Sequence, residues 1–354
     1  MKVVIDISPL HTGHKTRGIG VYTKELVRAL KSLDRKNQYI LTTRPQEVKH
    51  ISLIHYPYFD LFFRTLPLKH KFPVVVTIHD VIPLIFPRDF RPGIKGKLRF
   101  LWQRLSLRQV SAVITDSANS KTDIIKYLKV KPSQITVIPL ASAPHFLTPV
   151  SSRQLQKIKH KYHLPDKFLL YVGDINPHKN LHRLIEAFSK IIPASPDVYL
   201  ILVSRSLAQP IPEAAKIKHL IQSLNLTAKI KLLTTVPLDP PTDLHSLYQL
   251  AQSYVHPSLY EGFGLPVLEA LTVGTPVVCS HAASLPEVYG AAAITIDPRD
   301  TESLTAGINQ SLQLTPKQRQ ALIHQGKNQS AQFSWRQTAQ RTLQVYHQIS
   351  HDQK

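Results

Sequence analysis

The sequence predicts an α/β protein with two domains. Its 354 residues are enough for two hydrophobic cores. Short apolar runs such as PVVVTI at 73–78 alternate with segments of helical periodicity, as in buried parallel strands joined by helices. The pattern stops at 141–152, ASAPHFLTPVSS, where prolines and small residues indicate a linker, and then begins again. We therefore expect two α/β/α domains, at 1–150 and 151–335.

The expected elements follow from the same periodicities. Apolar residues three and four positions apart predict a helix over 21–33. Strands are expected at 2–7, 39–43, 51–55, 73–78, 112–116 and 135–139 in the first domain, and at 168–172, 198–203, 254–255 and 276–279 in the second. Further helices are expected at 92–110, 181–192 and 243–253, and the chain ends in two polar helices.

A glycine-bearing stretch at 256–280, HPSLYEGFGLPVLEALTVGTPVVCS, has the pattern of a loop, a helix and a buried strand. Gly262 and Gly264 bracket Phe263, so the backbone there can approach a ligand closely. Pro266 suits the first helical turn, because its missing N–H has no helical partner in any case. The N–H groups and the positive dipole end of such a helix favour an anion such as a phosphate.

Two carboxylates, Glu261 and Glu269, stand eight positions apart in this stretch. Carboxylates beside a phosphate site can accept hydrogen bonds from hydroxyls, as on a ribose or a sugar. Phosphate and hydroxyls together indicate a sugar nucleotide. The alternative is a capped helix that carries two surface acids.

Two other turns have the strand–loop–helix order that suits an anion. The loop SPLHTGHKTRGIG at 8–20 ends in Gly18 and Gly20, although GIG alone is equally typical of a plain turn. In GDINPHKN at 173–180, Lys179 stands at the start of a helix, where its ammonium can reach a diphosphate as a point charge.

The cysteine usage indicates a reducing compartment. The one cysteine, Cys279, falls in an expected buried strand, so no disulfide framework can form. The first segment, MKVVIDISPL, has a short apolar run interrupted by Asp6, which is typical of a strand rather than a signal peptide. We therefore expect a cytoplasmic protein.

The net charge of +21 is concentrated in one half of the chain. Residues 1–161 hold 28 Lys and Arg and 9 Asp and Glu, whereas residues 162–354 hold 16 and 14. A strongly basic half attracts nucleic acid, anionic lipid or an acidic polymer. A generally basic proteome is the alternative, but it does not explain why the halves differ. Aromatic residues are not interleaved with the basic ones as a stacking platform, so no nucleic-acid partner is expected.

The expected helix at 92–110 has two interpretations. Leu98, Leu101 and Leu105 fall at helical spacing together with Trp102, and lysines and arginines surround them. This pattern is typical of a basic amphipathic helix on an anionic membrane, which would place the protein peripherally on the inner face. It is equally typical of an ordinary domain helix with a solvated basic face.

Three motifs resemble one family. PSLYEGFGLPVLEA at 257–270, TIHD at 77–80 and GDINPHKN at 173–180 resemble the signatures of the retaining glycosyltransferases of family 4, which have the GT-B fold. The resemblance covers nearly the whole chain and leans toward the mannosyltransferase-like members. It implies two Rossmann-like domains that face across a cleft, the first for the acceptor and the second for the nucleotide sugar. It also implies that a last helix, at about 336–354, packs back on the first domain.

The resemblance implies transfer of a mannose- or glucose-type hexose from a nucleotide diphosphate sugar to a hydroxyl, with retention and without a bound metal or other cofactor. The acceptor is a glycan or a lipid-linked molecule, and GDP-mannose is favoured over a UDP-hexose as donor. His79, Glu261 and Lys179 are the implied catalytic residues, with Glu269 on the ribose. The implied donor-binding residues are Gly20, Lys179, Asn180, Glu261, Gly262, Phe263, Gly264, Leu265 and Glu269.

The acceptor side is predicted from the first domain. Tyr56 and Tyr58 follow an expected strand, at the end where open α/β sheets bind ligands, and Asp80 is implied to support His79. The chain departs from the family at His178 and Asp174, where many members have basic residues, so the positive clamp is thinner. A sugar-nucleotide epimerase of the same fold and a basic nucleic-acid-binding protein are the alternative functions.

Overall fold

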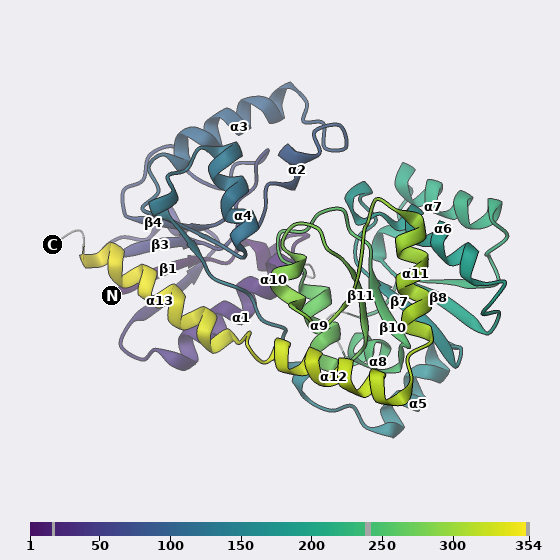
Figure 1. Cartoon of the computed structure of the whole chain (residues 1–354). Helices are drawn as coiled ribbons and strands as arrows, with labels where there is room; N and C mark the ends of the chain where they lie inside the picture. Colours follow the sequence, from purple (N-terminus) through teal and green to yellow (C-terminus); the bar gives the residue numbers. More distant parts are fainter. Residues whose placement is uncertain (16–17, 238–241, 352–354) are drawn as a thin grey trace. The chain divides into compact units, whose positions relative to one another are not determined.

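The computed structural model describes residues 1–15, 18–237 and 242–351 (Figure 1). In this part of the chain there are two compact units. The first comprises Met1–Ala141 and Phe333–Lys354, and the second comprises Ser142–Gln332. Each contains a six-stranded parallel sheet with flanking helices, which confirms the predicted α/β class.

The sheet of the first unit has the order β2-β1-β3-β4-β5-β6, and its neighbouring strands are parallel. The strands are β1 (Lys2–Asp6), β2 (Gln38–Thr42), β3 (Leu53–Tyr56), β4 (Val74–Thr77), β5 (Ala112–Thr115) and β6 (Ile135–Val137). Strands β3, β4 and β5 are buried along their whole length. Both faces of these strands are covered, which is why their sequences are mostly continuous apolar runs.

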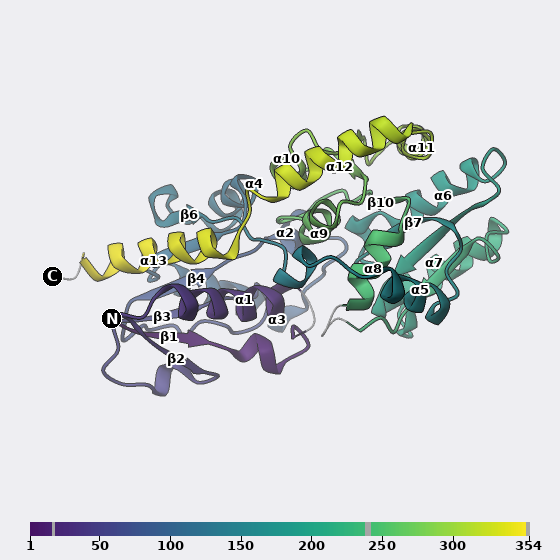
Figure 2. The ribbon, with the colours of Figure 1, turned by 90° about the horizontal axis from the view of Figure 1, so that it is seen from below.

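Helix α13 (Trp335–His351) packs along α1 (Gly18–Leu33), although the two are separated by most of the sequence (Figures 1 and 2). The other helices of the first unit include α2 (Ile82–Ile85), α3 (Ile94–Leu107), α4 (Ala118–Asp123) and the π-helix η3 (Ile124–Leu128). Three short 3₁₀ helices also belong to it: η1 (Ser8–His11), η2 (Pro45–Glu47) and η4 (Pro132–Gln134).

A buried polar network ties α13 to the sheet. The Nδ1 atom of His55 lies 2.6 Å from the hydroxyl oxygen of Tyr346 on α13, and its Nε2 atom lies 2.9 Å from Oγ1 of Thr77. The Tyr22 hydroxyl of α1 is 2.9 Å from the same Thr77 oxygen. Burial lowers the pKa of His55 to about 3, so the ring is neutral and depends on these partners. The network therefore specifies where α13 lies on the sheet.

The sheet of the second unit has the order β12-β11-β10-β7-β8-β9 and is also parallel. Its strands are β7 (Lys167–Val172), β8 (Val198–Val203), β9 (Ile230–Leu233), β10 (Ser253–His256), β11 (Val277–Ser280) and β12 (Ile294–Ile296). The sequence does not predict β9 and β12. Both are edge strands with partly exposed residues, so they lack the continuous apolar run that marks the central strands.

Helices flank this second sheet, and α6 packs against α11 while α9 packs against α12 (Figure 1). Their bounds are α5 (Ser152–Lys161), α6 (Leu181–Ile191), α7 (Pro212–Ser223), α8 (Thr242–Leu250), α9 (Leu265–Val273), α10 (Leu285–Tyr289), α11 (Thr301–Leu312) and α12 (Pro316–Ser330). Short 3₁₀ turns occur at η5 (Pro144–Leu147), η6 (Pro177–Lys179) and η7 (Arg205–Ala208). Among the described residues, no helix combines the length and apolarity that crossing a membrane requires.

The segment predicted as a linker, 141–152, is partly built into the second unit. Phe146 of η5 is buried, and its ring centroid lies 5.8 Å from that of Tyr248. The hydroxyls of Ser142 and Thr272 are 3.0 Å apart. A buried aromatic residue between two prolines escapes a prediction that relies on periodicity alone, because a single anchor has no period.

Helix α1 begins three residues earlier than predicted, so Gly20 lies in its first turn rather than in the loop before it. A Cβ atom on Gly20 would stand 2.4 Å from the carbonyl oxygen of His14 and 2.5 Å from that of Lys15. These are backbone atoms, so the preceding loop can pass this turn only because residue 20 has no side chain.

We predict that Gly20→Ala lowers the free energy of unfolding by about 1–3 kcal/mol, since the loop must shift to admit the methyl group. Gly13→Ala is the matched control, because a Cβ there meets nothing within 4 Å. Urea unfolding of both variants checks this expectation. Equal losses in the two proteins would contradict the steric explanation.

Candidate functional site

The C-terminal ends of strands β7 and β10 carry the main candidate residues of the second unit. These strands are neighbours, so their ends lie side by side at the edge of the sheet where α/β proteins bind ligands. The turn after β7 carries Lys179, and the loop after β10 carries Glu261. The sheet thus brings together two residues that are 82 positions apart in the sequence.

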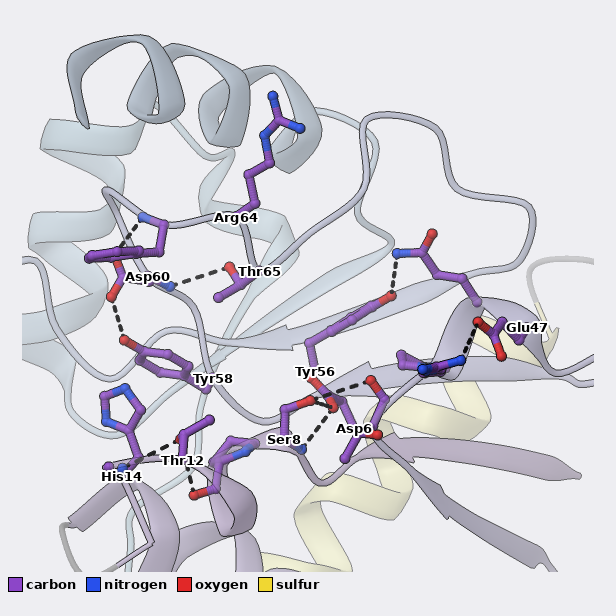
Figure 3. A pocket seen from close by; sticks show the side chains of 17 residues that line it. Asp6, Ser8, Thr12, His14, Glu47, Tyr56, Tyr58, Asp60, Arg64 and Thr65 are labelled. Atoms are coloured by element: carbon purple, nitrogen blue, oxygen red, sulfur yellow. Dashed lines mark hydrogen bonds and ion pairs between the residues drawn. The ribbon is translucent and has the colours of Figure 1, made fainter. Parts of the chain in front are cut away.

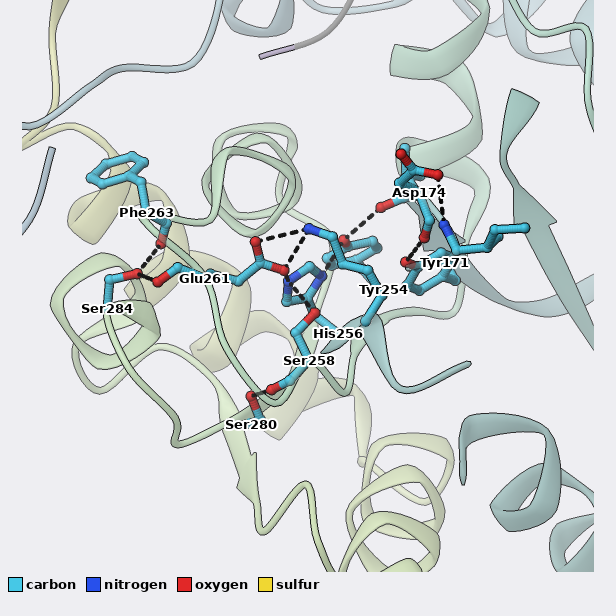
Figure 4. A network of polar contacts seen from close by, with 12 residues as sticks. Tyr171, Asp174, Tyr254, His256, Ser258, Glu261, Phe263, Ser280 and Ser284 are labelled. Atoms are coloured by element: carbon cyan, nitrogen blue, oxygen red, sulfur yellow. Dashed lines mark hydrogen bonds and ion pairs between the residues drawn. The ribbon is translucent and has the colours of Figure 1, made fainter. Parts of the chain in front are cut away.

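Lys179 and Glu261 form a largely buried ion pair (Figure 4). The Nζ atom of Lys179 lies 2.8 Å from both carboxylate oxygens of Glu261. The Nε2 atom of His256, the last residue of β10, lies 2.9 Å from Oε1 of the same carboxylate. An ammonium has three N–H donors, so the two contacts with Glu261 leave one donor of Lys179 for a ligand oxygen.

Glu261 is ionised in this setting. Burial by itself raises the pKa of a carboxyl group, but the charge of Lys179 and the hydrogen bond from His256 outweigh it. The pKa of Glu261 is therefore held well below its usual range. The site presents a fixed negative charge and a fixed positive charge in contact.

His256 contacts three side chains. A carboxylate can only accept, so the Nε2 atom of His256 carries the proton that Glu261 accepts. Its Nδ1 atom lies 2.8 Å from the Tyr254 hydroxyl oxygen, and that hydroxyl donates to the carbonyl of Val172 at 3.3 Å. The Ser258 hydroxyl lies 3.1 Å from Nε2. His256 thus orients Glu261 from inside the protein and is itself fully buried.

Serine hydroxyls hold the loop that carries Glu261 (Figure 4). The Ser284 hydroxyl lies 2.8 Å from the carbonyl oxygen of Glu261 and 2.9 Å from that of Phe263. The Ser280 hydroxyl donates to the carbonyl of Ser258 at 2.6 Å. Because both serines are fully buried, these bonds replace water as partners of the loop carbonyls.

Gly264 begins helix α9 in a conformation that favours glycine. Its φ is +115°, and a Cβ atom would stand 2.7 Å from a methyl carbon of Leu285. Helix α9 then starts at Leu265 with Pro266 in its first turn. The predicted residues Gly262, Phe263 and Gly264 are buried next to this helix N-terminus, whose N–H groups and dipole attract an anion.

Glu269 lies one turn further along α9 and has a different environment from Glu261. The Tyr248 hydroxyl donates to its Oε2 atom at 3.0 Å. Burial raises the pKa of Glu269 to about 8, and this hydrogen bond offsets only part of the effect. At neutral pH the site therefore holds one ionised carboxylate, Glu261, and one carboxyl group that is mostly protonated, Glu269.

Asn180 joins two loops of the site through its side-chain amide nitrogen. Its side chain is fully buried, and its amide nitrogen donates to the carbonyls of Pro257 and Pro298 at 3.0 and 2.6 Å. Its φ is +60°, a left-handed conformation that asparagine tolerates. Asn180 thus ties the Lys179 turn to the loop after β10.

The turn that carries Lys179 has few positive charges, as the departures at Asp174 and His178 predict. The Oδ1 atom of Asp174 accepts hydrogen bonds from the Ile175 N–H at 2.8 Å and the Ser206 hydroxyl at 2.6 Å. Burial, together with the charge of Lys179, lowers the pKa of His178 to about 4, so His178 is neutral. Lys179 supplies the positive charge of this turn.

In the first unit, His79 follows β4 and makes two contacts through its ring. Its Nδ1 atom lies 2.7 Å from Oδ2 of Asp116, and its Nε2 atom lies 3.2 Å from the carbonyl oxygen of Pro57. Burial alone lowers the pKa of His79, but the charge of Asp116 and its hydrogen bond outweigh it and raise the pKa. Two acceptors around one ring fit an imidazolium that donates from both nitrogens.

A pocket of about 770 Å³ opens at the C-terminal ends of β1, β2 and β3 (Figure 3). Tyr56 and Tyr58, predicted on the acceptor side, both line it, and Tyr58 donates to Asp60 at 2.5 Å. The Oδ1 atom of Asp80 accepts the N–H of Ile82 at 2.9 Å, and the charge of Asp80 contributes to the raised pKa of His79. Charged residues of both signs also line the pocket: Asp6, Arg44, Glu47, Asp60 and Arg64.

Sequence reasoning assigned no role to four residues that shape these sites. Asp116 and His256 each stand at the C-terminal end of a parallel strand or next to it, and that position was the available signal. Tyr248 and Ser284 carried no signal, because their contacts depend on how helix α8 and the segment before α10 pack. Among the described residues, no group of three or more His, Cys, Asp or Glu side chains is arranged to hold a metal ion.

Comparison with known proteins now identifies the family. The description "Glycosyl transferases group 1" matches residues 152–329, and "Glycosyltransferase Family 4" matches residues 37–141. The chain therefore belongs to the group 1 glycosyltransferases of family 4, as its motifs predict.

Curated relatives include mannosyltransferases. O-antigen chain mannosyltransferase B of Escherichia coli is 32% identical over 275 residues, which cover 77% of this chain and 69% of the relative. Serotype-specific mannosyltransferase WbdA of Escherichia coli is 30% identical over 273 residues. That match covers 77% of this chain but only 33% of WbdA, so the chain spans a third of that relative.

Solved structures share the fold. Sucrose-phosphate synthase from Thermosynechococcus elongatus aligns with a TM-score of 0.73 and 19% identity, covering 98% of each chain. HepE from Anabaena, solved in complex with UDP-glucose, aligns with a TM-score of 0.74 and 19% identity, covering 99% of each chain. At this identity the comparison establishes the GT-B fold, which confirms the predicted fold class.

We predict that Lys179→Met lowers the free energy of unfolding at pH 7 by about 3–5 kcal/mol, because the buried Glu261 charge loses its cation. The folded-state pKa of Glu261 is depressed, so its contribution is present above the unfolded pKa and is lost as pH falls through the folded pKa. The deficit of the variant should therefore shrink on acidification. Urea unfolding at pH 7 and at a pH below the usual pKa range of carboxyl groups measures it.

Lys167→Met is the matched control, because Lys167 pairs with Asp197 at 2.5 Å on the surface, with both side chains exposed. That substitution should cost at most about 1 kcal/mol. Similar losses at positions 167 and 179 would show that burial of the Glu261 pair has no special effect.

Proposed function

We propose that the protein transfers a hexose, with mannose favoured, from a nucleotide diphosphate sugar to a hydroxyl of a glycan or lipid-linked acceptor, with retention of configuration. GDP-mannose is the proposed donor, in keeping with the mannosyltransferase names of the relatives. The observation that carries the proposal is the contact between Lys179 and Glu261 at the sheet edge, next to the N-terminus of α9.

The donor is held by three kinds of contact. The free N–H of Lys179 and the first turn of α9 bind the diphosphate, so a point charge and a helix dipole do the work that a metal ion does elsewhere. Glu261, already oriented by His256, accepts hydrogen bonds from hydroxyls of the donor sugar. Glu269 accepts from the ribose hydroxyls. The different environments of the two carboxyl groups support two separate roles.

The reaction needs no protein side chain as a general base. The bond from the anomeric carbon to the diphosphate oxygen breaks, and the acceptor oxygen forms a bond to the same face of that carbon. The acceptor proton passes to the leaving phosphate oxygen, and nucleoside diphosphate is the second product. Lys179 and the α9 dipole stabilise the negative charge that develops on the leaving group.

His79 is proposed to contact the transferred sugar. Both of its N–H groups already have protein acceptors, and an imidazolium has no lone pair to accept a proton, so His79 acts through its charge rather than as a base. Asp116 is a positioning residue for this ring.

The acceptor is proposed to enter the pocket lined by Tyr56 and Tyr58. Its lining combines aromatic rings with carboxylates and guanidinium groups, which suits a sugar because rings pack on C–H faces while charged groups bind hydroxyls. The volume of about 770 Å³ is within the range of small-molecule sites.

We predict transfer of mannose from GDP-mannose to an added acceptor, with the anomeric configuration of the donor kept in the product. Proton NMR of the anomeric signal measures both yield and configuration, and UDP-glucose is tested in parallel. Lys179→Ala and Glu269→Ala should each lower kcat/KM at least about tenfold, because each removes a charge-assisted contact to the donor. Addition of EDTA should leave the rate unchanged.

Lys190→Ala is the control substitution, since Lys190 pairs with Glu302 on the exposed side of α6. Its kcat/KM should equal that of the unaltered protein. Unchanged turnover in the Lys179 and Glu269 variants would refute the donor roles. Conversion of the donor in the absence of any acceptor, into an epimer of its sugar, would indicate an epimerase instead.

We further predict that donor binding releases about one proton per molecule at pH 7. Burial raises the pKa of Glu269 to about 8, and ribose hydroxyls that donate to it favour its ionised form. Affinity should therefore rise with pH up to about 8. Titration calorimetry in two buffers of different ionisation enthalpy measures the proton count, which Glu269→Gln should abolish. The same count in both proteins would exclude Glu269 as the source.

A further inference from the structure

Helix α3 directs a line of large apolar side chains into solvent. Ile94 is 81% exposed, Leu98 62%, Leu101 54% and Leu105 48%. Their spacing of four, three and four residues places them on one face of the helix, along a stripe of about 16 Å. Phe63, on the loop beside the helix, is 64% exposed and extends the apolar surface. We call these five residues the α3 stripe.

The opposite face of α3 is buried although it is partly polar. The Gln103 side chain is fully buried, and its Nε2 atom donates to the carbonyl of Asp60 at 3.1 Å and to Thr65 Oγ1 at 2.5 Å. The Ser106 hydroxyl is also fully buried and donates to the carbonyl of Pro67 at 2.5 Å. These bonds fix the rotation of the helix, so the leucines of the α3 stripe stay on the outward face. Leu107 and Phe100 pack on the core, so the helix is apolar on both faces, unlike an ordinary surface helix.

Basic residues border the stripe on both sides. Helix α3 carries four Lys and Arg and no acidic residue. At 100° per residue, Lys95 and Arg99 fall on one side of the stripe, and Lys97 and Arg104 on the other. The guanidinium carbon of Arg99 lies 5.4 Å from the ring centre of Phe63, so charge and apolar surface are in direct contact.

The stripe adjoins the pocket proposed for the acceptor. Phe63 belongs to both, because it lines the pocket and contacts Arg99 of α3. Arg64 also lines the pocket, and its guanidinium carbon lies 4.3 Å from the ring centre of Trp102 on α3. In Figure 3, Arg64 points away from Tyr58 and Asp60. One short loop thus forms the pocket wall and the edge of the apolar surface.

We infer that the α3 stripe is a docking surface for an anionic lipid bilayer, and that docking brings the adjacent pocket to the membrane surface. Apolar side chains enter the acyl region while the flanking lysines and arginines pair with anionic headgroups. The charge complementarity selects this occupant, since residues 1–141, the part of the first unit that carries α3, hold 24 basic and 9 acidic residues. The inference rests on the proposed transferase function and makes its acceptor lipid-linked.

The experiment is co-sedimentation of the full chain with vesicles of phosphatidylcholine alone or with one-third phosphatidylglycerol. Binding should be at least tenfold tighter on the anionic vesicles. It should weaken when salt rises from about 0.1 M to about 1 M, which shortens the screening length from about 10 Å to about 3 Å. Equal binding to both vesicles at all salt concentrations overturns the inference.

Two variants test the stripe and its border separately. Leu98→Ser with Leu101→Ser should weaken binding to anionic vesicles at least tenfold, whereas Leu147→Ser should not. Leu147 is the matched control, because it is 69% exposed but lies on η5 of the second unit. Since all three side chains are exposed, the variants should keep the far-ultraviolet circular dichroism of the original protein. Undiminished binding by the double variant overturns the inference.

Charge reversal has an equally close control. Lys95→Glu with Lys97→Glu should also weaken binding at least tenfold, because two charges that attract an anionic surface are replaced by two that it repels. Lys216→Glu with Lys218→Glu makes the same change at the same spacing, on exposed positions of α7. Equal losses in the two pairs would assign binding to net charge alone and overturn the α3 assignment.

A second copy of the chain is the competing occupant, and light scattering without vesicles decides it. A dimer that the Leu98 and Leu101 substitutions dissociate overturns the inference. Nucleoside diphosphate binding is measured on the same samples by thermal shift. If the protein binds nucleotide but not vesicles, only the docking inference is overturned. If it binds vesicles but not nucleotide, only the proposed transferase function is contradicted.

Discussion

A buried ammonium and a buried carboxylate hold the two loops of the second unit in register. The Lys179–Glu261 pair joins the turn after β7 to the loop after β10. Removal of either charge would leave the other buried without an ionic partner. Asn180 and Ser284 brace the same loops through backbone carbonyls. The groups proposed to bind the donor are therefore set before any ligand arrives, which lowers the reorganisation required on binding.

This arrangement also explains why two glutamates on one short stretch can differ in function. Glu261 faces a cation and a histidine donor, whereas Glu269 faces a tyrosine hydroxyl on an apolar helix side. The first environment stabilises the ionised form and the second destabilises it. The two glutamates of one motif thus differ in protonation state. Residues outside the motif cause the difference, so the spacing of the glutamates alone does not reveal it.

Several features could be read from the sequence, and the reasons are local. Strands β4 and β8 are continuous apolar runs. Glu261 and Lys179 stand in motifs whose glycines and prolines mark turns between a strand and a helix. The edge strand β9 lacked such a run, because only central strands are buried on both faces. The pairing of His79 with Asp116 depends on which strands are neighbours, a property of topology rather than of sequence spacing. The sequence likewise did not determine which face of α3 is exposed. Its periodicity fits either orientation, and the burial of Gln103 decides between them.

The position of α13 has a consequence for biosynthesis. The second unit is one continuous segment, whereas the first needs a helix encoded after it. Domains usually complete their folding from the N-terminus onward as they leave the ribosome. Here the first unit is completed last, because α1 and His55 gain their partners on α13 only after residues 142–332 of the second unit have been made. The first unit can therefore be completed only after the second unit has been synthesised.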